Sequence, residues 1–262
     1  MSEIVGVVGA GRMGLPIIGH LAKAGFRTLA SDIDPKKRVA VESRGAAWVP
    51  DLSGQCDIVL VCVGFDREVC ELLDRGLKPR PDGIVAILST VHPKTVQELA
   101  RKASGMQVID STVCRGGEAA DKGTLLSFVG GPAAVVARIT PVLRAYSADV
   151  VHTGDVGSAQ VAKAVNNLIL WACLVADHEG LALAKRYGVD VEKLRKALLL
   201  SSATNDALEK WGRQTMAWAD DDMAIVAAMA AERGIALPQA EVTREVCRAL
   251  KPRRYKLDDY GA

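Results

Sequence analysis

Apolar and polar positions follow two kinds of pattern along the first 150 or so residues of the chain. Short apolar runs, such as the β-branched run at 4–8 and a second stretch at 28–31, are typical of strands buried in a parallel sheet. Similar runs occupy residues 57–64, 83–90, 106–111, 125–131 and 148–154. Between most of them lie stretches with apolar residues at helical spacing, at 67–76, 95–104 and 133–146. This alternation predicts a doubly wound, mostly parallel sheet that binds ligands beyond the carboxyl ends of its strands.

After Gly157 the pattern is helical. Residues 158–187 contain no proline and a single glycine, which predicts one helix of about thirty residues and about 45 Å. Several helices and no strand follow as far as residue 250. The predicted fold is therefore α/β, with an N-terminal Rossmann-type doubly wound parallel sheet over 1–157. An all-α C-terminal domain over 158–262 begins with the long interdomain helix. The tail, 251–262, is expected to be a solvated end, with contact to a partner subunit as the alternative.

A glycine-rich segment, GAGRMG, stands where the first strand meets the first helix. In a dinucleotide-binding loop Gly9 permits a tight turn, Gly11 lets the backbone approach a pyrophosphate, and Gly14 lets the helix pack on the strand. Amides at the helix start would hold the phosphates. Asp32 ends the second strand about twenty residues later, where such a unit keeps an acid for the adenosine ribose. The strand–glycine–helix context favours a nicotinamide dinucleotide cofactor.

The acid at position 32 favours NAD over NADP, because a carboxylate accepts from both ribose hydroxyls and repels a 2′-phosphate. Ile33 supports this preference, since an arginine directly after the acid would indicate the phosphorylated cofactor. Lys36, Lys37 and Arg38 keep NADP open, either as a phosphate clamp or as a solvated helix start. The prediction is NAD, with NADP possible.

Composition changes the picture little. With 262 residues, 49% of them hydrophobic, the chain is long enough for two domains, and its net charge of +2 gives no reason to expect nucleic acid. No apolar stretch is expected to approach the roughly twenty residues that cross a bilayer, so we expect a cytoplasmic protein without membrane contact. The six cysteines form no C-x-x-C pair and do not cluster with the four histidines, so neither a metal site nor a disulfide framework is indicated.

The start of the long helix carries candidate chemistry. Lys163 stands three and four residues before Asn166 and Asn167, so an amine and two amides share one helix face. A partly desolvated lysine beside a nicotinamide could exchange a proton with a substrate hydroxyl. The alternative is a lysine that reaches solvent beside structural asparagines. Ser89 and Thr90 end another strand and either face the nicotinamide or form an ordinary turn.

Four segments, in this order, resemble the β-hydroxyacid dehydrogenase family, which includes 3-hydroxyisobutyrate dehydrogenase, tartronate semialdehyde reductase and 6-phosphogluconate dehydrogenase. They are GVVGAGRMG, ILSTVHP, DSTVCRGGEAADKGTLLSFVGG and GSAQVAKAVNN. The resemblance implies that Lys163 is the catalytic acid/base, that Asn167 positions the substrate, and that the protein is a homodimer. The cofactor-binding set is then Gly9, Gly11, Arg12, Met13, Gly14, Asp32, Val63, Ser89 and Thr90. The substrate-binding set is Cys114, Arg115, Gly116, Asn166 and Asp222.

The chain departs from the family at the substrate site. Cys114 stands where the family has a serine, and Arg115 stands where it has the first of two glycines. The second glycine is retained as Gly116. Arg115 either grips an anionic substrate group, which would favour larger or more anionic substrates, or is a surface arginine. Asp221 replaces a lysine that precedes the retained Asp222. A pocket aromatic is not at its usual place. Either Trp211 or Trp218 substitutes for it, or both pack helices.

Three functions remain open. The leading prediction is an NAD(P)-dependent dehydrogenase that acts on a small anionic 3-hydroxy acid or the matching semialdehyde. An imine reductase is the second, although retention of Lys163 and Asn167 argues against it. The third is a catalytically impaired nucleotide-binding protein, suggested by the altered substrate loop.

Overall fold

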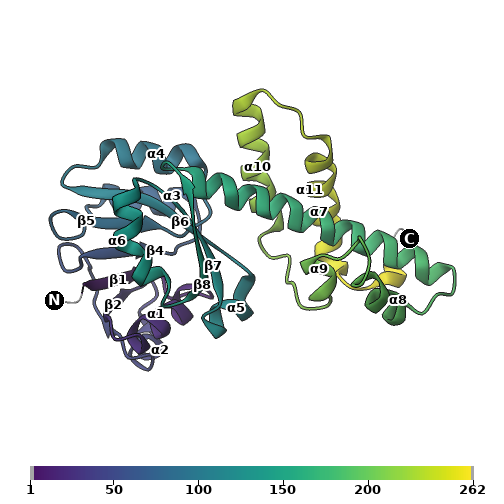
Figure 1. Cartoon of the computed structure of the whole chain (residues 1–262), viewed down its shortest axis with the longest axis horizontal. Coiled ribbons are helices and arrows are strands. Elements are labelled where there is room, and N and C mark those ends of the chain that lie inside the picture. Colours follow the sequence, from purple (N-terminus) through teal and green to yellow (C-terminus); the bar gives the residue numbers. More distant parts are fainter. Residues whose placement is uncertain (1–2, 261–262) are drawn as a thin grey trace. The chain divides into compact units, whose positions relative to one another are not determined.

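The computed structural model describes residues 3–260, so the extreme ends of the two expected domains lie outside the described residues. It contains one eight-stranded sheet and a set of helices (Figure 1). The strands are β1 (Ile4–Val8), β2 (Arg27–Ser31), β3 (Ala47–Trp48), β4 (Ile58–Val61), β5 (Gly83–Ile87), β6 (Met106–Cys114), β7 (Leu125–Gly130) and β8 (Ser147–Gly154). The helices are α1 (Gly14–Lys23), α2 (Arg38–Glu42), α3 (Asp66–Asp74), α4 (Pro93–Lys102), α5 (Gly116–Lys122), α6 (Ala133–Leu143), α7 (Ser158–Arg186), α8 (Val191–Leu198), α9 (Asp206–Glu209), α10 (Ala219–Arg233) and α11 (Pro238–Leu250).

The strand order is β3-β2-β1-β4-β5-β6-β7-β8, with β1 to β6 parallel. Chain order reverses between β1 and β4, and at such a point a doubly wound sheet opens a ligand crevice. The glycine loop follows β1 at this point, and Val63 follows β4. The predicted Rossmann-type sheet is confirmed.

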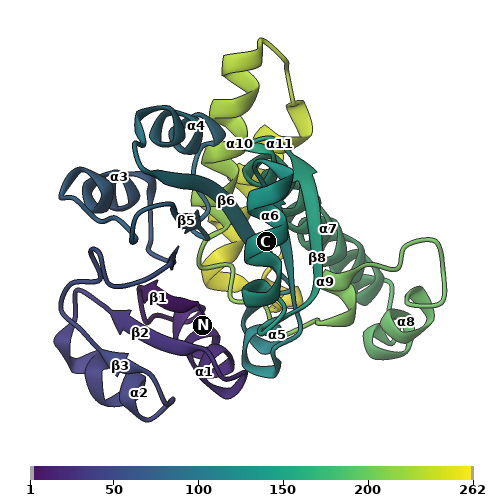
Figure 2. The same ribbon diagram turned by 60° about the vertical axis from the view of Figure 1, so that its left-hand side comes forward.

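Alternate strand residues point to two apolar cores. Val5 and Val7 of β1 face a core shared with α1, α2, α5 and α6, whereas Ile4 and Val8 face a core shared with α3 and α4. Figure 2 shows α3 and α4 together on one side of the sheet. Because both faces are covered, the central strands β1, β4 and β5 are apolar throughout, as the sequence pattern indicated.

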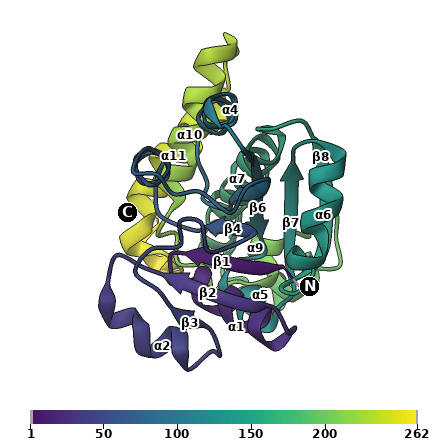
Figure 3. The same cartoon turned by 90° about the vertical axis from the view of Figure 1, so that its left-hand side faces the viewer.

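The region between β6 and β8 is less regular than the sequence indicated. β7 runs antiparallel to β6, and β8 runs parallel to β7 beside α6 (Figure 3). β6 extends three residues beyond the expected end, to Cys114, and the short helix α5 follows it. A short return through α5, with no crossover over the sheet, places the next strand antiparallel.

The boundary between the two structural units of the chain lies within α7. The chain forms two compact units that divide between Lys163 and Ala164. In the second unit, buried side chains of α7 such as Trp171 and Leu174 pack with residues of α9, α10 and α11. The predicted long helix is confirmed, with 29 residues.

The length of α7 corrects one expectation. An 18-residue window of this helix has a mean hydropathy of 1.4, so by length and composition alone it could cross a membrane. In the structure 39% of that window is buried. The helix is apolar because it supplies the core of the helical unit, and the core helices of soluble proteins pass the same test.

The tail was expected to be solvated, and most of its residues as far as Tyr260 are exposed, while Tyr255 and Tyr260 are partly buried. The Tyr255 ring lies against His178 and Trp211, and the Tyr260 hydroxyl donates to Glu179 of α7. Lys185 of α7 pairs with Asp258 at 2.6 Å. Aromatic burial and paired charges thus hold the tail on the long helix.

Candidate active site

The loop after β1 has the steric form of a dinucleotide cradle. Gly9 has φ +97°, and a Cβ there would overlap the carbonyl oxygen of Cys62. A Cβ on Gly14 would overlap the carbonyl oxygen of Gly9. Neither position accepts a side chain, because backbone atoms cannot give way as a flexible side chain can. These two glycines bring β1, α1 and β4 into contact.

Gly11 differs from its neighbours. A Cβ there would meet no protein atom within 4 Å, and the residue is exposed. Packing therefore does not require glycine at this position. Bare backbone facing open space at the start of a helix is what a pyrophosphate needs for close approach.

Asp32 connects the end of β2 to this loop. One carboxylate oxygen accepts from the Ala10 amide at 2.6 Å and the other from the Asp34 amide at 2.9 Å. Each oxygen keeps a further lone pair for a ribose hydroxyl. Ile33 is 98% exposed, so a side chain at this position does not contribute to the core. Arg38, one of the residues that kept NADP open, pairs with Glu42 one helical turn later.

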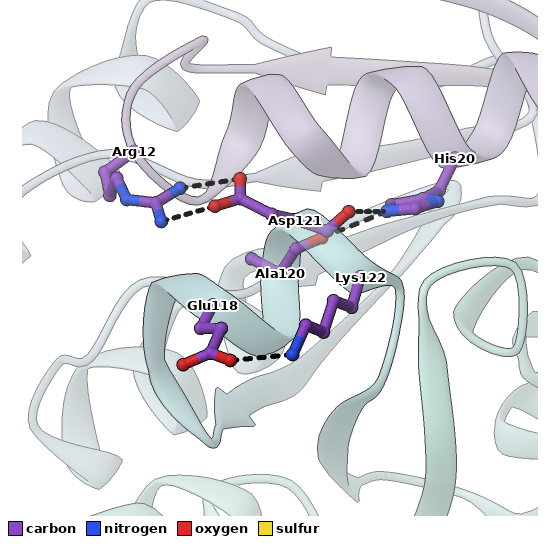
Figure 4. Close-up of polar contacts among 6 residues, drawn as sticks. All are labelled: Arg12, His20, Glu118, Ala120, Asp121 and Lys122. Atoms are coloured by element: carbon purple, nitrogen blue, oxygen red, sulfur yellow. Dashed lines mark hydrogen bonds and ion pairs between the residues drawn. The ribbon is translucent and has the colours of Figure 1, made fainter. Parts of the chain in front are cut away.

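Arg12 lies at the tip of the loop and contacts α5 (Figure 4). Its guanidinium forms two hydrogen bonds to Asp121, at 2.9 and 2.7 Å, and these hold the pKa of Asp121 below its usual value. Within α1, the His20 ring contacts the carbonyl oxygens of Ala120 and Asp121. A Cβ on Gly117 would lie 2.6 Å from the Arg12 guanidinium carbon. The loop is thus attached to α5, whose first residue ends the predicted substrate segment, residues 114–116.

Ser89 serves the framework around the site. Its hydroxyl accepts from the Val63 amide at 2.9 Å, and the residue is buried. This bond joins the segments that follow β4 and β5, on the two strands after the switch point. Thr90 is partly exposed. Of this Ser-Thr pair, the Thr90 side chain is therefore the one with access to solvent.

The predicted substrate segment begins at the end of β6. Cys114 is buried as the last residue of the strand, and Arg115 follows in the left-handed conformation with φ +83°. A glycine adopts this conformation without strain, as Gly116 does next, at φ +75°. The Arg115 guanidinium pairs with Asp149 of β8 at 2.6 Å and donates to the Thr124 carbonyl. In the structure these two contacts hold the Arg115 side chain at the surface, and a role in substrate binding stays a prediction.

Lys163 lies in the second turn of α7 with its amine turned toward β6. The Nζ atom donates to the Val113 carbonyl at 2.8 Å and lies 3.9 Å from the Cys114 sulfur. The side chain is partly buried. It is therefore held against the strand that leads into the substrate segment.

Asn166 and Asn167 follow on α7, in the helical unit. Asn167 is buried, and its side-chain oxygen accepts from the side-chain nitrogen of Asn166 at 3.1 Å. Asp222 of α10 accepts from the Trp171 indole at 2.9 Å, while Asp221 is exposed. These contacts give Asp222 a role in fixing α10 on α7.

The two tryptophans take different places. The Trp211 ring lies 4.5 Å from that of His178, in the cluster that holds the tail, and is a packing residue. Trp218 is 55% exposed at the start of α10. None of the six cysteines forms a disulfide, and within 3–260 no group of three or more His, Cys, Asp or Glu side chains is placed to hold a metal ion.

Sequence reasoning missed two residues beside this site, Asp110 and Gln160. Both are buried and both hydrogen-bond to backbone groups that flank the predicted site residues. A signal for Asp110 was present, because a carboxylate inside the apolar run of β6 must find partners on folding. For Gln160 no signal stood out, since glutamine is common in helices.

Comparison with known proteins places these features in a family. Residues 4–154 match the NAD binding domain of 6-phosphogluconate dehydrogenase, and residues 157–262 match the NAD-binding domain of NADP-dependent 3-hydroxyisobutyrate dehydrogenase. The 3-hydroxyisobutyrate dehydrogenase of Pseudomonas aeruginosa is 34% identical over 213 residues, 78% of this chain and 72% of that protein. The chain belongs to the β-hydroxyacid dehydrogenase family. This β-hydroxyacid dehydrogenase has an NAD(P)-binding domain and is an NAD(P)-dependent hydroxyacid oxidoreductase.

A further relative and two solved structures are also similar to this chain. The 2-(hydroxymethyl)glutarate dehydrogenase of Eubacterium barkeri is 29% identical over 215 residues, 78% of this chain and 71% of that protein. A solved structure of Mycobacterium tuberculosis 3-hydroxyisobutyrate dehydrogenase with L-serine matches the whole of both chains with a TM-score of 0.90 at 20% identity. An imine reductase from Myxococcus stipitatus, in complex with NAD⁺, shares the fold with a TM-score of 0.68 at 21% identity, over 99% of this chain and 97% of that one.

Proposed function

We propose that this β-hydroxyacid dehydrogenase interconverts a small 3-hydroxy acid and its semialdehyde, with Lys163 as the general acid/base. The observation that carries the proposal is the anchoring of the Lys163 amine on the Val113 carbonyl, directly before the substrate segment. A lysine that only reached solvent would not be turned toward a strand.

The anchoring fits a proton-transfer role. A neutral amine that donates one hydrogen to Val113 keeps its lone pair, with which Nζ accepts the proton of a substrate hydroxyl. In the reverse direction the ammonium returns this proton to the oxygen of the semialdehyde. The contact fixes the rotation about the Cε–Nζ bond, so the two remaining positions on Nζ have set directions before the substrate arrives.

The residues around the glycine loop fit a nicotinamide dinucleotide. The exposed backbone at Gly11 and the start of α1 would hold the pyrophosphate, and Asp32 would hold the adenosine ribose. When bound, the cofactor supplies the hydride acceptor or donor. The carboxylate of Asp32 supports NAD as the preferred form. Arg12, Met13 and, beyond this loop, Val63, Ser89 and Thr90 complete the proposed cofactor set.

The substrate class follows from the relatives' names and from Arg115. 3-Hydroxyisobutyrate, 2-(hydroxymethyl)glutarate and L-serine all carry a CH₂OH group on the carbon that bears the carboxylate. Because the Arg115 guanidinium pairs with Asp149 at 2.6 Å, an additional anionic group on the substrate would have to compete with that carboxylate. We therefore favour a small acid of this type, bound through backbone of residues 114–116 together with Asn166, Asn167 and Asp222.

The domain organisation and assembly belong to the same proposal. We place the NAD(P)-binding domain at 1–157 and the helical domain at 158–262, and the two family matches, which end at 154 and begin at 157, support this division. We also propose a cytoplasmic location and a homodimer. The homodimer is supported by an apolar stripe on α7, where Val161, Val165 and Ile169 are 42%, 50% and 58% exposed.

The test is nicotinamide absorbance over time with NAD and then NADP. The panel contains 3-hydroxyisobutyrate, L-serine, a phosphorylated 3-hydroxy acid and, in the reductive direction, a cyclic imine. Lys163→Ala is expected to lower turnover by a factor of about 10² to 10⁴ while cofactor affinity is retained. Lys185→Ala, on the same helix but paired with Asp258, is the matched control and is expected to behave as wild type.

Each outcome decides between the candidates. Turnover of a hydroxy acid that Lys163→Ala abolishes supports the proposal. Turnover of the imine alone would replace it with an imine reductase. Tight cofactor binding without turnover of any compound would identify a nucleotide-binding protein, and unchanged turnover in Lys163→Ala would refute the role of the lysine.

A further inference from the structure

The first turn of α7 is attached to β6 through a buried carboxylate. Asp110 has no exposed surface, and its two oxygens accept from the Gly157 amide at 2.8 Å and the Gln160 amide at 2.9 Å. Burial raises the pKa of Asp110, and the two amide hydrogen bonds oppose that shift. These amides belong to a helix N-terminus, which has no internal partners for them and favours negative charge.

Two further residues of β6 contact the same helix. The Thr112 hydroxyl donates to the Ala159 carbonyl at 3.0 Å, and the Val113 carbonyl accepts from Lys163 Nζ at 2.8 Å. Asp110, Thr112 and Val113 thus attach the first two turns of α7 along the length of one strand. The position of the lysine amine relative to the sheet is set by these contacts.

Gln160 extends this attachment to the segment after β5. The residue is 1% exposed, its side-chain oxygen accepts from the Val91 amide at 3.0 Å, and its side-chain nitrogen donates to the Ser89 carbonyl at 2.8 Å. Residues 89–91 lie outside the helices and strands, and only the Ser89 amide is bound to a neighbouring strand end, at the Val61 carbonyl of β4. The Gln160 amide therefore supplies backbone hydrogen bonds that secondary structure does not.

Gln160 and Lys163 lie three residues apart on α7, so they are neighbours on one side of the helix. The backbone of Gln160 is held by Asp110, and its side chain holds the segment that contains Thr90. Gln160 thus connects the helix that carries Lys163 to the segment expected beside the nicotinamide.

We propose that Gln160 is a positioning residue, which sets the location of residues 89–91 relative to the Lys163 amine, and that Asp110 holds Gln160 in place. The inference rests on the proposed function, because it takes Lys163 as the acid/base and residues 89–90 as the nicotinamide segment. A glutamine that merely stabilised the fold would affect the amount of folded enzyme and leave the rate per folded molecule unchanged.

The decisive variants are Gln160→Met and Gln160→Glu. Methionine has a similar shape and makes neither hydrogen bond, so kcat per cofactor-binding molecule is expected to fall about tenfold to a hundredfold, with the dissociation constant for NADH changed less than about threefold. A protonated glutamate can accept from the Val91 amide and donate to the Ser89 carbonyl. An ionised glutamate has no hydrogen to donate, so its oxygen and the Ser89 carbonyl oxygen repel each other. The kcat of Gln160→Glu relative to wild type should therefore rise as the pH is lowered from 8 to 6.

Gln97→Glu is the matched control. Gln97 is an exposed glutamine that donates to the Val156 carbonyl at 3.1 Å, beside the start of α7 but away from residues 89–91. Its kcat relative to wild type should not change with pH. Should Gln160→Met fail to fold, the pH dependence of Gln160→Glu still tests the proposal.

Amide exchange separates this inference from the proposed function. Loss of the Gln160 oxygen should accelerate hydrogen exchange of the Val91 amide, whatever reaction the enzyme catalyses. A folded Gln160→Met variant with wild-type kcat, a pH-independent ratio for Gln160→Glu, or unchanged Val91 exchange would each overturn the inference. Unchanged turnover in Lys163→Ala would instead overturn the role of the lysine, even with Val91 exchange accelerated as expected.

Discussion

Substitution of Gly14 by alanine tests whether this glycine serves folding and Gly11 serves the cofactor. A Cβ on Gly14 would overlap the Gly9 carbonyl oxygen, so either that carbonyl or α1 must move. Gly9 is not free to move. Its amide donates to the Ser31 carbonyl at 2.8 Å, and the next amide, of Ala10, donates to Asp32 at 2.6 Å.

The expected magnitude follows from these contacts. Overpacking a tight site costs about 1–3 kcal/mol, and weakening a hydrogen bond to a charged group adds up to about 1.5–3 kcal/mol. We take about 3 kcal/mol for Gly14→Ala as the free energy lost, because the helix can share part of the displacement. At roughly 2–4 °C per kcal/mol for a unit of this size, the Tm of the sheet unit should fall by about 6–12 °C.

Gly11→Ala is the matched variant, since its Cβ meets no protein atom and its φ is not in the left-handed region. Its Tm should lie within about 2 °C of wild type, because surface substitutions change stability by no more than about 0.5 kcal/mol. Its NADH dissociation constant should rise at least about tenfold, the effect of losing about 1.5 kcal/mol of phosphate contact. Thermal unfolding by circular dichroism and titration of NADH fluorescence give the two quantities. Equal Tm values for Gly14→Ala and Gly11→Ala, or wild-type NADH affinity in Gly11→Ala, would refute the reasoning.

Three further predictions concern the cofactor, the substrate segment and the tail. Asp32→Ala should raise the dissociation constant for NADH about tenfold or more and leave that for NADPH unchanged or lower, because the carboxylate that binds the ribose and repels a 2′-phosphate is gone. Fluorescence titrations in which both cofactors lose affinity equally would contradict this. Arg115→Gly should keep or raise the Tm, because relief of the left-handed backbone gains about 1 kcal/mol and loss of the exposed pair with Asp149 costs about 0–1 kcal/mol. A tenfold rise in KM for the hydroxy acid would show that the guanidinium reaches the substrate. Burial lowers the pKa of His178, so the unfolded chain takes up a proton near pH 6.5 before the folded chain does, and stability should be lost as the pH falls below about 6.5. His178→Gln should have a Tm that depends less on pH between 8 and 5.5, and equal slopes would refute the assignment.

The sequence by itself determined what depends on neighbouring positions. The β-branched run at 4–8 predicted a strand buried on both faces, and the absence of proline over 158–187 predicted α7 almost to the residue. The need for glycine at positions 9 and 14 could be predicted because the turn from strand to helix leaves no room for a side chain. Such features are local, since periodicity and steric exclusion act within a few residues along the chain.

Only the tertiary structure decided how distant segments meet. The direction of β7 depends on a short return that forms its own helix, and the orientation of Arg115 depends on Asp149 two strands away. Arg12 and Asp121 are 109 residues apart, and Asp110 and Gln160 are 50 apart. No local pattern encodes these pairings. They arise because folding buries a carboxylate beside a helix N-terminus and brings an arginine against an aspartate, and each charge then takes the partner that the neighbouring strand or helix presents.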